Sequence, residues 1–238
     1  MNAIHGNEII RDDPHALSLF AARWLADRIA AGNDRFRIAL AGGNTPRELY
    51  TLLGSSDYVV DWDKVVLFWG DERFVLATDP RSNYRMVHEV LLSHVPIPAQ
   101  NIIPIPTDGD PADAARRYEA DLKREYAADT CDSTEPLFDL VLLGLGADGH
   151  ICSLFPNSPV LEERTRLTAA VLQGAPEPRI TLTYPAIESS RTIAFLVTGV
   201  EKAGVVARVR AGDQALPAAR IRPQGEIVWF LDKAAAGK

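Results

Sequence analysis

The sequence predicts an α/β fold: a doubly wound, mostly parallel sheet with helices on both faces. Short continuous apolar runs, which are typical of strands buried on both sides, recur along the chain. Helical patterns lie between most of these runs, and parallel strands need such crossover connections. The chain has 238 residues, a length at which α/β proteins commonly form one domain, so we expect residues 1–238 to be a single domain.

Each expected strand is a short apolar run. The runs EII, FRIALA, KVVLFW, LFDLVLL, RITLT, TIAFLVT and EIVWFL place strands at Glu8–Ile10, Phe36–Ala41, Lys64–Trp69, Leu137–Leu143, Arg179–Thr183, Thr192–Thr198 and Glu226–Leu231. Most of these runs lack the alternation of a half-exposed strand, which favours a sheet covered on both faces.

The expected helices lie between these strands. They cover Pro14–Ala31, Pro46–Leu53, Asn83–Leu92, Pro111–Ala127 and Lys202–Arg210. Several begin with proline, which the first helical position tolerates because an N–H group there would have no partner within the helix. Ligands bind beyond the carboxyl ends of the strands in such folds, so the loops after the strands are where we expect the chemistry.

Composition narrows the classes of function. The net charge of -7 argues against a protein whose main partner is nucleic acid. The N-terminal segment has no apolar stretch, and runs such as Leu140–Leu145 are too short to span a bilayer, so no membrane partner is expected. Cys131 and Cys152 lack CxxC spacing and indicate a reducing compartment, and we therefore expect a cytoplasmic protein.

The segment AGGNTP is the first candidate for binding an anion. Gly42, Gly43, Asn44 and Thr45 follow an expected strand and precede an expected helix. Glycines let the backbone approach a phosphate, and the helix N-terminus supplies free N–H groups. The same residues also fit a tight turn with Thr45 as the helix N-cap and Pro46 at the first helical position.

A charged group follows the third expected strand. Asp71, Glu72 and Arg73 come after Gly70, at the edge of the sheet where an α/β fold forms its crevice. The alternative is a solvated turn with incidental charge. Further along, Ser82 or Asn83 is expected either to cap the next helix or to contact the substrate.

The loop GLGADGH offers a proton-transfer group. Asp148 and His150 lie in a glycine-rich loop after a buried strand, and histidine exchanges protons near neutral pH. His150 is therefore the candidate general base, although an isolated histidine often serves only as a structural hydrogen-bonding group. No HExxH or comparable spacing appears among the five histidines, so no metal site is expected.

Arg179 and Lys202 complete the set of candidates. Arg179 opens the run RITLT, and Lys202 follows TIAFLVTG. A guanidinium fork and a lysine point charge together suit a phosphate clamp. Either residue could instead lie on the surface.

Taken together, these segments resemble the 6-phosphogluconolactonase family. The pieces AGGNTP, WGDERFV, SNYRM, GLGADGHICSLFP, RITLT, VTGVEKA and PAARIRP occur in the family's order over most of the chain, and DGH followed by SLFP is the most specific of them. The family commonly has Ser in place of Asn44, and frequently in place of Ala41. Both substitutions leave the backbone N–H groups of the loop available.

The resemblance implies a single-domain fold like that of glucosamine-6-phosphate deaminase, no required cofactor, and hydrolysis of 6-phosphogluconolactone to 6-phosphogluconate in the pentose phosphate pathway. The expected partner is a small phosphosugar lactone, and the expected state is a monomer or weak homodimer. In the expected mechanism, His150 activates water and returns a proton to the ring oxygen. Arg73 stabilises the carbonyl oxygen, and Asp148 or Asp71 orients His150.

Two other functions compete with this interpretation. Glucosamine-6-phosphate deaminase has a similar glycine loop and a similar DGH segment, but it has Asn-Glu-Pro where this chain has LFPNSP, without a glutamate. A sugar-phosphate-binding protein without catalysis would need the phosphate clamp but not His150.

Overall fold

A six-stranded, wholly parallel sheet forms the centre of the computed structural model, which describes residues 4, 6–32, 35–126 and 135–238. The strands lie in the order β1-β9-β8-β5-β2-β3. Their bounds are Asn7–Arg11 for β1, Phe36–Leu40 for β2, Val65–Trp69 for β3, Phe138–Leu143 for β5, Ser190–Val197 for β8 and Glu226–Asp232 for β9. All six strands were expected from the sequence, and the parallel α/β class is confirmed.

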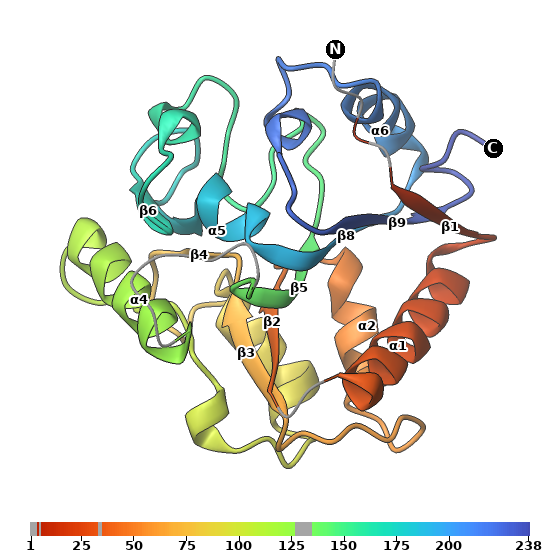
Figure 1. Ribbon diagram of the computed structural model, residues 1–238, viewed down its shortest axis with the longest axis horizontal. Helices are drawn as coiled ribbons and strands as arrows, with labels where there is room; N and C mark the ends of the chain where they lie inside the picture. The colour runs from red at the N-terminus through yellow and green to blue at the C-terminus, as the bar shows by residue number, and fades with distance from the viewer. Residues whose placement is uncertain (1–3, 5, 33–34, 127–134) are drawn as a thin grey trace.

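Helices cover both faces of this sheet. In Figure 1, α1 (Pro14–Ala31) and α2 (Thr45–Leu53) lie together below β8 and β9, and α6 (Ala203–Arg210) lies above them. The other helices are α3 (Asn83–Val87), α4 (Pro111–Tyr126) and α5 (Tyr184–Glu188), with short 3₁₀ turns at Ala99–Asn101, Pro159–Glu162, Val200–Lys202 and Pro217–Arg220. The expected helix at Asn83–Leu92 is interrupted, because its second half, His88–Leu92, is π-helical.

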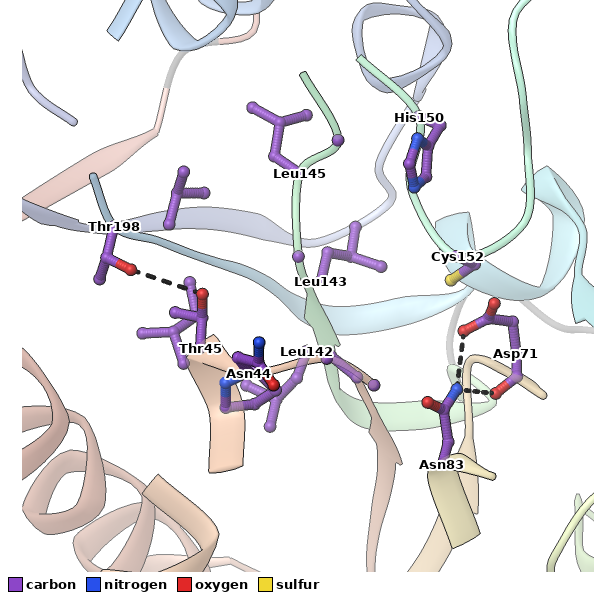
Figure 2. A pocket seen from close by; sticks show the side chains of 18 of the residues that line it. Asn44, Thr45, Asp71, Asn83, Leu142, Leu143, Leu145, His150, Cys152 and Thr198 are labelled. Carbon is purple, nitrogen blue, oxygen red and sulfur yellow. Dashed lines mark hydrogen bonds between the residues drawn. The ribbon is translucent and has the colours of Figure 1, made fainter. Parts of the chain in front are cut away.

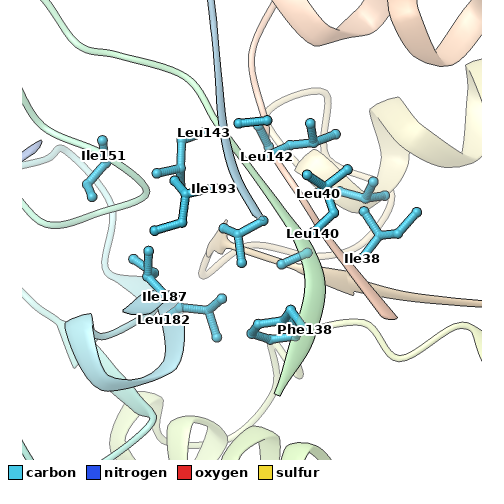
Figure 3. Close-up of a cluster of buried hydrophobic side chains, with 14 of the residues drawn as sticks. Ile38, Leu40, Phe138, Leu140, Leu142, Leu143, Ile151, Leu182, Ile187 and Ile193 are labelled. Atoms are coloured by element: carbon cyan, nitrogen blue, oxygen red, sulfur yellow. The ribbon is translucent and has the colours of Figure 1, made fainter. Parts of the chain in front are cut away.

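The sheet interior is made of the apolar runs that predicted the strands. Ile38 and Leu40 of β2 pack beside Leu140 and Leu142 of β5 (Figure 3), and every one of them is at most 3% exposed. One hydrophobic cluster includes side chains from every strand of the central sheet except β1, together with residues of the helices. We propose on this basis that the chain folds as a single domain.

A second, three-stranded antiparallel sheet was not expected. It has the order β4-β7-β6, with β4 at Asp71–Arg73, β7 at Arg179–Leu182 and β6 at Thr168–Val171. The sequence placed no strand at residues 71–73, for which a solvated turn was one alternative, and none at 168–171, and it assigned the strand Arg179–Thr183 to the main sheet. The strand at Arg179 is confirmed, but its sheet was not foreseen: β7 pairs with the nearby β6 and with β4, which lies about 100 residues earlier in the chain.

Within the described ranges, no helix is long and apolar enough to cross a membrane. Ala127, the expected last residue of the fourth helix, lies outside those ranges, as do Cys131 and His5.

Candidate functional site

The pocket lies where the strand order reverses. From β2 the chain moves outward to β3, whereas from β5 it moves the other way to β8, so a crevice opens beyond the carboxyl ends of β2 and β5. A cavity of about 290 Å³ occupies this crevice. Of the ten predicted site residues, nine line it: Gly42, Gly43, Asn44, Thr45, Asp71, Arg73, His150, Arg179 and Lys202.

The glycine loop between β2 and α2 forms one wall of the pocket. Gly43 has φ 95°, a conformation that favours glycine, and Gly42 lies flat against the side-chain amide of Asn83. A Cβ atom on Gly42 would lie 2.1 Å from Asn83 Oδ1, so a larger residue there would displace the Asn83 side chain. Tyr50 Oη donates to Ala41 O at 2.9 Å and anchors the loop from below.

The helix after this loop begins one residue earlier than expected. Asn44 occupies the N-cap position, with helical φ and ψ and no capping bond from its side chain, and Thr45 is the first helical residue. Thr45 is therefore not the N-cap. Its Oγ1 instead lies 3.4 Å from Thr198 Oγ1, at the end of β8, and both threonines line the pocket (Figure 2).

The charged segment after β3 is a strand, and its alternation separates the three side chains. Asp71 and Arg73 line the pocket, whereas Glu72 points to the opposite side, where it is 2% exposed. The alternative of a solvated turn is therefore wrong. Burial raises the pKa of Glu72, although bonds from the N–H groups of Tyr84, Asn83 and Arg73 and from Ser82 Oγ act against this shift.

Asp71 is held by several neighbours rather than by His150. Ser153 Oγ donates to Asp71 Oδ2 at 2.5 Å, and Asn83 Nδ2 lies 2.9 Å from Asp71 O and 3.4 Å from Asp71 Oδ1. A guanidinium nitrogen of Arg179 lies 3.9 Å from Oδ2. Within the described ranges, none of the hydrogen bonds of Asp71 reaches His150.

Arg73 and Arg179 face each other across the small sheet, as paired residues of β4 and β7. The Nε atoms of both residues are buried without a hydrogen-bond partner in the described part of the chain. Burial lowers the pKa of Arg179, Asp71 counters this shift, and the charge of Arg73 adds to it. Two half-buried guanidinium groups that line the same pocket favour an anion or a polarised oxygen beside them.

Asp148 and His150 form a directed pair in the loop after β5. His150 Nδ1 lies 2.6 Å from Asp148 Oδ1, and Asp148 itself does not line the cavity. Partial burial raises the pKa of Asp148, but hydrogen bonds from His150 outweigh burial and hold the pKa below its ordinary value. When Nδ1–H is donated to the carboxylate, Nε2 keeps its lone pair free for a proton from another group.

The loop glycines give this pair its shape. A Cβ atom on Gly146 would lie 2.1 Å from His150 Nδ1, so only glycine leaves room for the ring. Gly149 has φ 79° and lies against Leu216, while its carbonyl accepts from Ala218 N at 2.9 Å. In Figure 2 the His150 ring extends from the loop toward Cys152 and Asp71.

Lys202 lines a different part of the pocket from Arg179. Its Nζ donates to Leu145 O at 2.8 Å, and it lies in the turn that leads from β8 into α6. Figure 2 shows Leu145 and the Thr45–Thr198 pair on the side of the pocket away from Asp71. The two cations of the expected clamp therefore have different neighbours.

The sequence did not identify three further pocket residues as site residues: Asn83, Cys152 and Thr198. Asn83 had two competing interpretations, and Ser82 proves to be the cap, since its Oγ accepts from Arg85 N at 3.1 Å. Burial raises the pKa of the Cys152 thiol well above its ordinary value, and Asp71 adds to the shift. No group of three or more His, Cys, Asp or Glu residues within the described ranges could hold a metal ion.

Comparison with known proteins places this pocket in a family. A family model described as glucosamine-6-phosphate isomerases/6-phosphogluconolactonase matches residues 12–229. The 6-phosphogluconolactonase of Nostoc sp. is 41% identical over 208 residues, which cover 86% of this chain and 85% of the relative. The 6-phosphogluconolactonase of Homo sapiens is 35% identical over 232 residues, which cover 93% of this chain and 87% of the relative.

The chain belongs to the 6-phosphogluconolactonase family. A solved 6-phosphogluconolactonase from Trypanosoma cruzi has the same fold, with a TM-score of 0.86 and 28% identity over 100% of this chain and 98% of that one. A monomeric glucosamine-6-phosphate deaminase has a TM-score of 0.79 at 22% identity, covering 97% of this chain and 99% of its own, and shares the fold. The resemblance drawn from the motifs is thus confirmed at the level of the family.

Proposed function

We propose that the protein hydrolyses 6-phospho-D-glucono-1,5-lactone to 6-phospho-D-gluconate, the lactonase step of the oxidative pentose phosphate pathway. The observation that carries this proposal is that His150, held by Asp148, lines the same cavity as a glycine loop and three cationic side chains. A general base and an anion-binding loop are what the ester bond and the phosphate of this substrate need. The relatives named 6-phosphogluconolactonase support the same reaction.

His150 is proposed to start the reaction. With Nδ1–H donated to Asp148, Nε2 removes a proton from water while the water oxygen attacks the lactone carbonyl. Arg73 stabilises the negative charge that develops on the carbonyl oxygen. The protonated imidazole of His150 then gives its proton to the departing oxygen of the lactone ring. The bond between the carbonyl carbon and this oxygen breaks, and the open-chain acid is released. Asp148 stabilises the imidazolium, whereas Asp71 is proposed to shape the pocket.

The phosphate is proposed to lie at the end of the pocket with Lys202. The backbone N–H groups of Gly42–Thr45, the hydroxyl group of Thr45 and the Lys202 ammonium group, all of which belong to residues that line the pocket, are proposed to bind it. Arg179, which the sequence placed in the same clamp, lies against Asp71 and opposite Arg73, so we propose that it binds the carbonyl end of the substrate. The monomer or weak homodimer expected from the resemblance stays a prediction.

The decisive experiment is hydrolysis of freshly generated 6-phosphogluconolactone, corrected for its spontaneous opening. We expect acceleration without added metal or nucleotide, and a much slower reaction with unphosphorylated gluconolactone. Lys202→Gln should raise KM by about ten- to a hundredfold, because a charge-assisted bond to phosphate contributes roughly 1.5–3 kcal/mol. Lys64→Gln, at the amino end of β3 and outside the pocket, is the matched control.

Three results would contradict the proposal. Activity that a chelator abolishes and a metal ion restores would require a different mechanism. Release of ammonia from glucosamine 6-phosphate at a comparable rate would favour the deaminase function. An unchanged KM in Lys202→Gln would remove that residue from the phosphate site.

A further inference from the structure

Asn83 is a buried polar residue at the floor of the pocket. It is the first residue of α3, it is 2% exposed, and it lines the cavity. Nδ2 lies 2.9 Å from Asp71 O and 3.4 Å from Asp71 Oδ1. Within the described ranges, no donor bonds to Asn83 Oδ1. This oxygen is not fully enclosed by protein atoms and can therefore be reached from the cavity.

The orientation of this amide follows from its neighbours. Both atoms of Asp71 that Asn83 approaches are acceptors, so the NH₂ group must point to Asp71 and the carbonyl oxygen away from it. Figure 2 shows this arrangement, with the dashed lines running from the nitrogen to Asp71. Asn83 therefore presents a fixed hydrogen-bond acceptor to the cavity.

The surroundings of Asn83 hold it rigidly. Its backbone N–H donates to Glu72 Oε1 at 2.8 Å, and the neighbouring Tyr84 N–H and Ser82 Oγ bond to Oε2 of the same carboxylate. On the other side the amide lies flat on Gly42. The Asn83 side chain is thus fixed by the bond of its backbone N–H, by the bond of its Nδ2 and by the contact with Gly42. A side chain that is already fixed loses little conformational entropy when it binds a ligand.

We propose that Asn83 Oδ1 accepts a hydrogen bond from a ring hydroxyl group of the phosphorylated sugar lactone. This inference rests on the proposed function. Oδ1 can only accept a hydrogen bond, so its partner in the substrate must be a donor. Neither the phosphate dianion nor the lactone carbonyl can donate. The hydroxyl groups at C2, C3 and C4 can, so Asn83 is a specificity-determining residue for one of them.

The test compares 6-phosphogluconolactone with its 2-deoxy, 3-deoxy and 4-deoxy analogues. The parent protein should hydrolyse at least one analogue with kcat/KM lowered about ten- to a hundredfold, because the buried acceptor then loses its partner. Asn83→Ala should lower kcat/KM for the full substrate by a similar factor and leave kcat/KM for that one analogue unchanged within about twofold. Such non-additivity is the signature of a direct contact.

Asn101→Ala is the matched control. Asn101 is equally buried, at 3% exposed, and donates Nδ2 to Asp63 O at 3.0 Å, but it lies outside the pocket. Its loss should reduce stability without changing the preference among the four lactones. A thermal melt of both variants measures the cost to the fold.

Three outcomes would overturn the proposal. The first is that the parent protein hydrolyses all three analogues as fast as the full substrate. This outcome can be measured without any variant. The second is Asn83→Ala lowering kcat/KM by one common factor for every lactone, and the third is a fall in kcat alone, as for a residue that positions water. If the parent protein hydrolysed none of the lactones, the proposed function would fail by itself, and calorimetry with 6-phosphogluconate and its deoxy analogues would still test Asn83.

Discussion

At the scale of single residues, the geometry of His150 makes a prediction that separates chemistry from binding. The ring is fixed by Asp148 at 2.6 Å and packs 4.9 Å from Phe155, centroid to centroid. His150→Asn should lower kcat by about 10²–10⁴-fold, the usual contribution of a general acid–base group. Because no phosphate contact is removed, the affinity for 6-phosphogluconate should stay near that of the parent protein, as calorimetry would measure.

His94→Asn is the control for this prediction. His94 is exposed and bonds to Glu89 O at 3.0 Å, away from the pocket, so its replacement should leave kcat unchanged. A folded His150→Asn protein with near-parental turnover would remove His150 as the base. A His150→Asn protein that does not fold would show a structural histidine instead.

At the scale of elements, a side chain of α4 protects one end of the edge strand β3. β3 ends the six-stranded sheet, and although Ile103 N–H donates to Leu67 O at 2.9 Å, no strand of the sheet pairs with its outer edge at Trp69. Tyr118 Oη donates to Trp69 O and accepts from Trp69 N, both at 2.9 Å. Burial raises the pKa of Tyr118, so its hydroxyl group stays protonated and can make both bonds.

Tyr118→Phe should therefore lower the free energy of unfolding by about 1–3 kcal/mol, because it leaves a buried N–H and a buried C=O group of Trp69 without a partner. Urea unfolding measures the change. Tyr58→Phe is the control: its exposed hydroxyl group bonds to Leu19 O at 3.2 Å, and its loss should change stability by no more than about 0.5 kcal/mol. Equal effects of the two substitutions would contradict the role given to Tyr118.

At the scale of the whole molecule, carboxylates with lowered pKa values make the fold sensitive to acid. Burial raises the pKa of Glu163, but bonds from the N–H groups of Arg166 and Thr165 and from Thr165 Oγ1 outweigh it and bring the pKa to about 2. Bonds from Arg81 likewise lower the pKa of Asp79 to about 2. The contribution of these two carboxylates to the stability of the fold is complete above the ordinary carboxylate pKa. It disappears as the pH falls through about 2.

The melting temperature of the parent protein should therefore fall steadily between about pH 4.5 and pH 2. Glu163→Gln should melt lower than the parent protein at pH 6, and the difference should shrink toward pH 2. Asp27→Asn, at an exposed position of α1 where the side chain makes no hydrogen bond or ion pair within the described ranges, should follow the parent curve at every pH. A constant difference between Glu163→Gln and the parent protein across this range would contradict the contribution assigned to Glu163.

The sequence by itself determined the six parallel strands, the long helices and the glycine loops at the carboxyl ends of β2 and β5. These features follow from local periodicity and from backbone conformations that few residues other than glycine adopt. It also indicated nine of the residues that line the cavity, because a parallel α/β sheet brings the loops after neighbouring strands to one edge.

Only the tertiary structure decided the small antiparallel sheet, the separation of Glu72 from Asp71 and Arg73, and the place of Asn83 in the pocket. A three-residue strand of charged side chains has no apolar pattern to reveal it, and it exists because β7, about 100 residues later, pairs with it. Which carbonyl holds Lys202 was decided in the same way, as was the bond that ties Asp71 to Ser153. Contacts between distant segments depend on how the whole chain packs, and no local pattern records them.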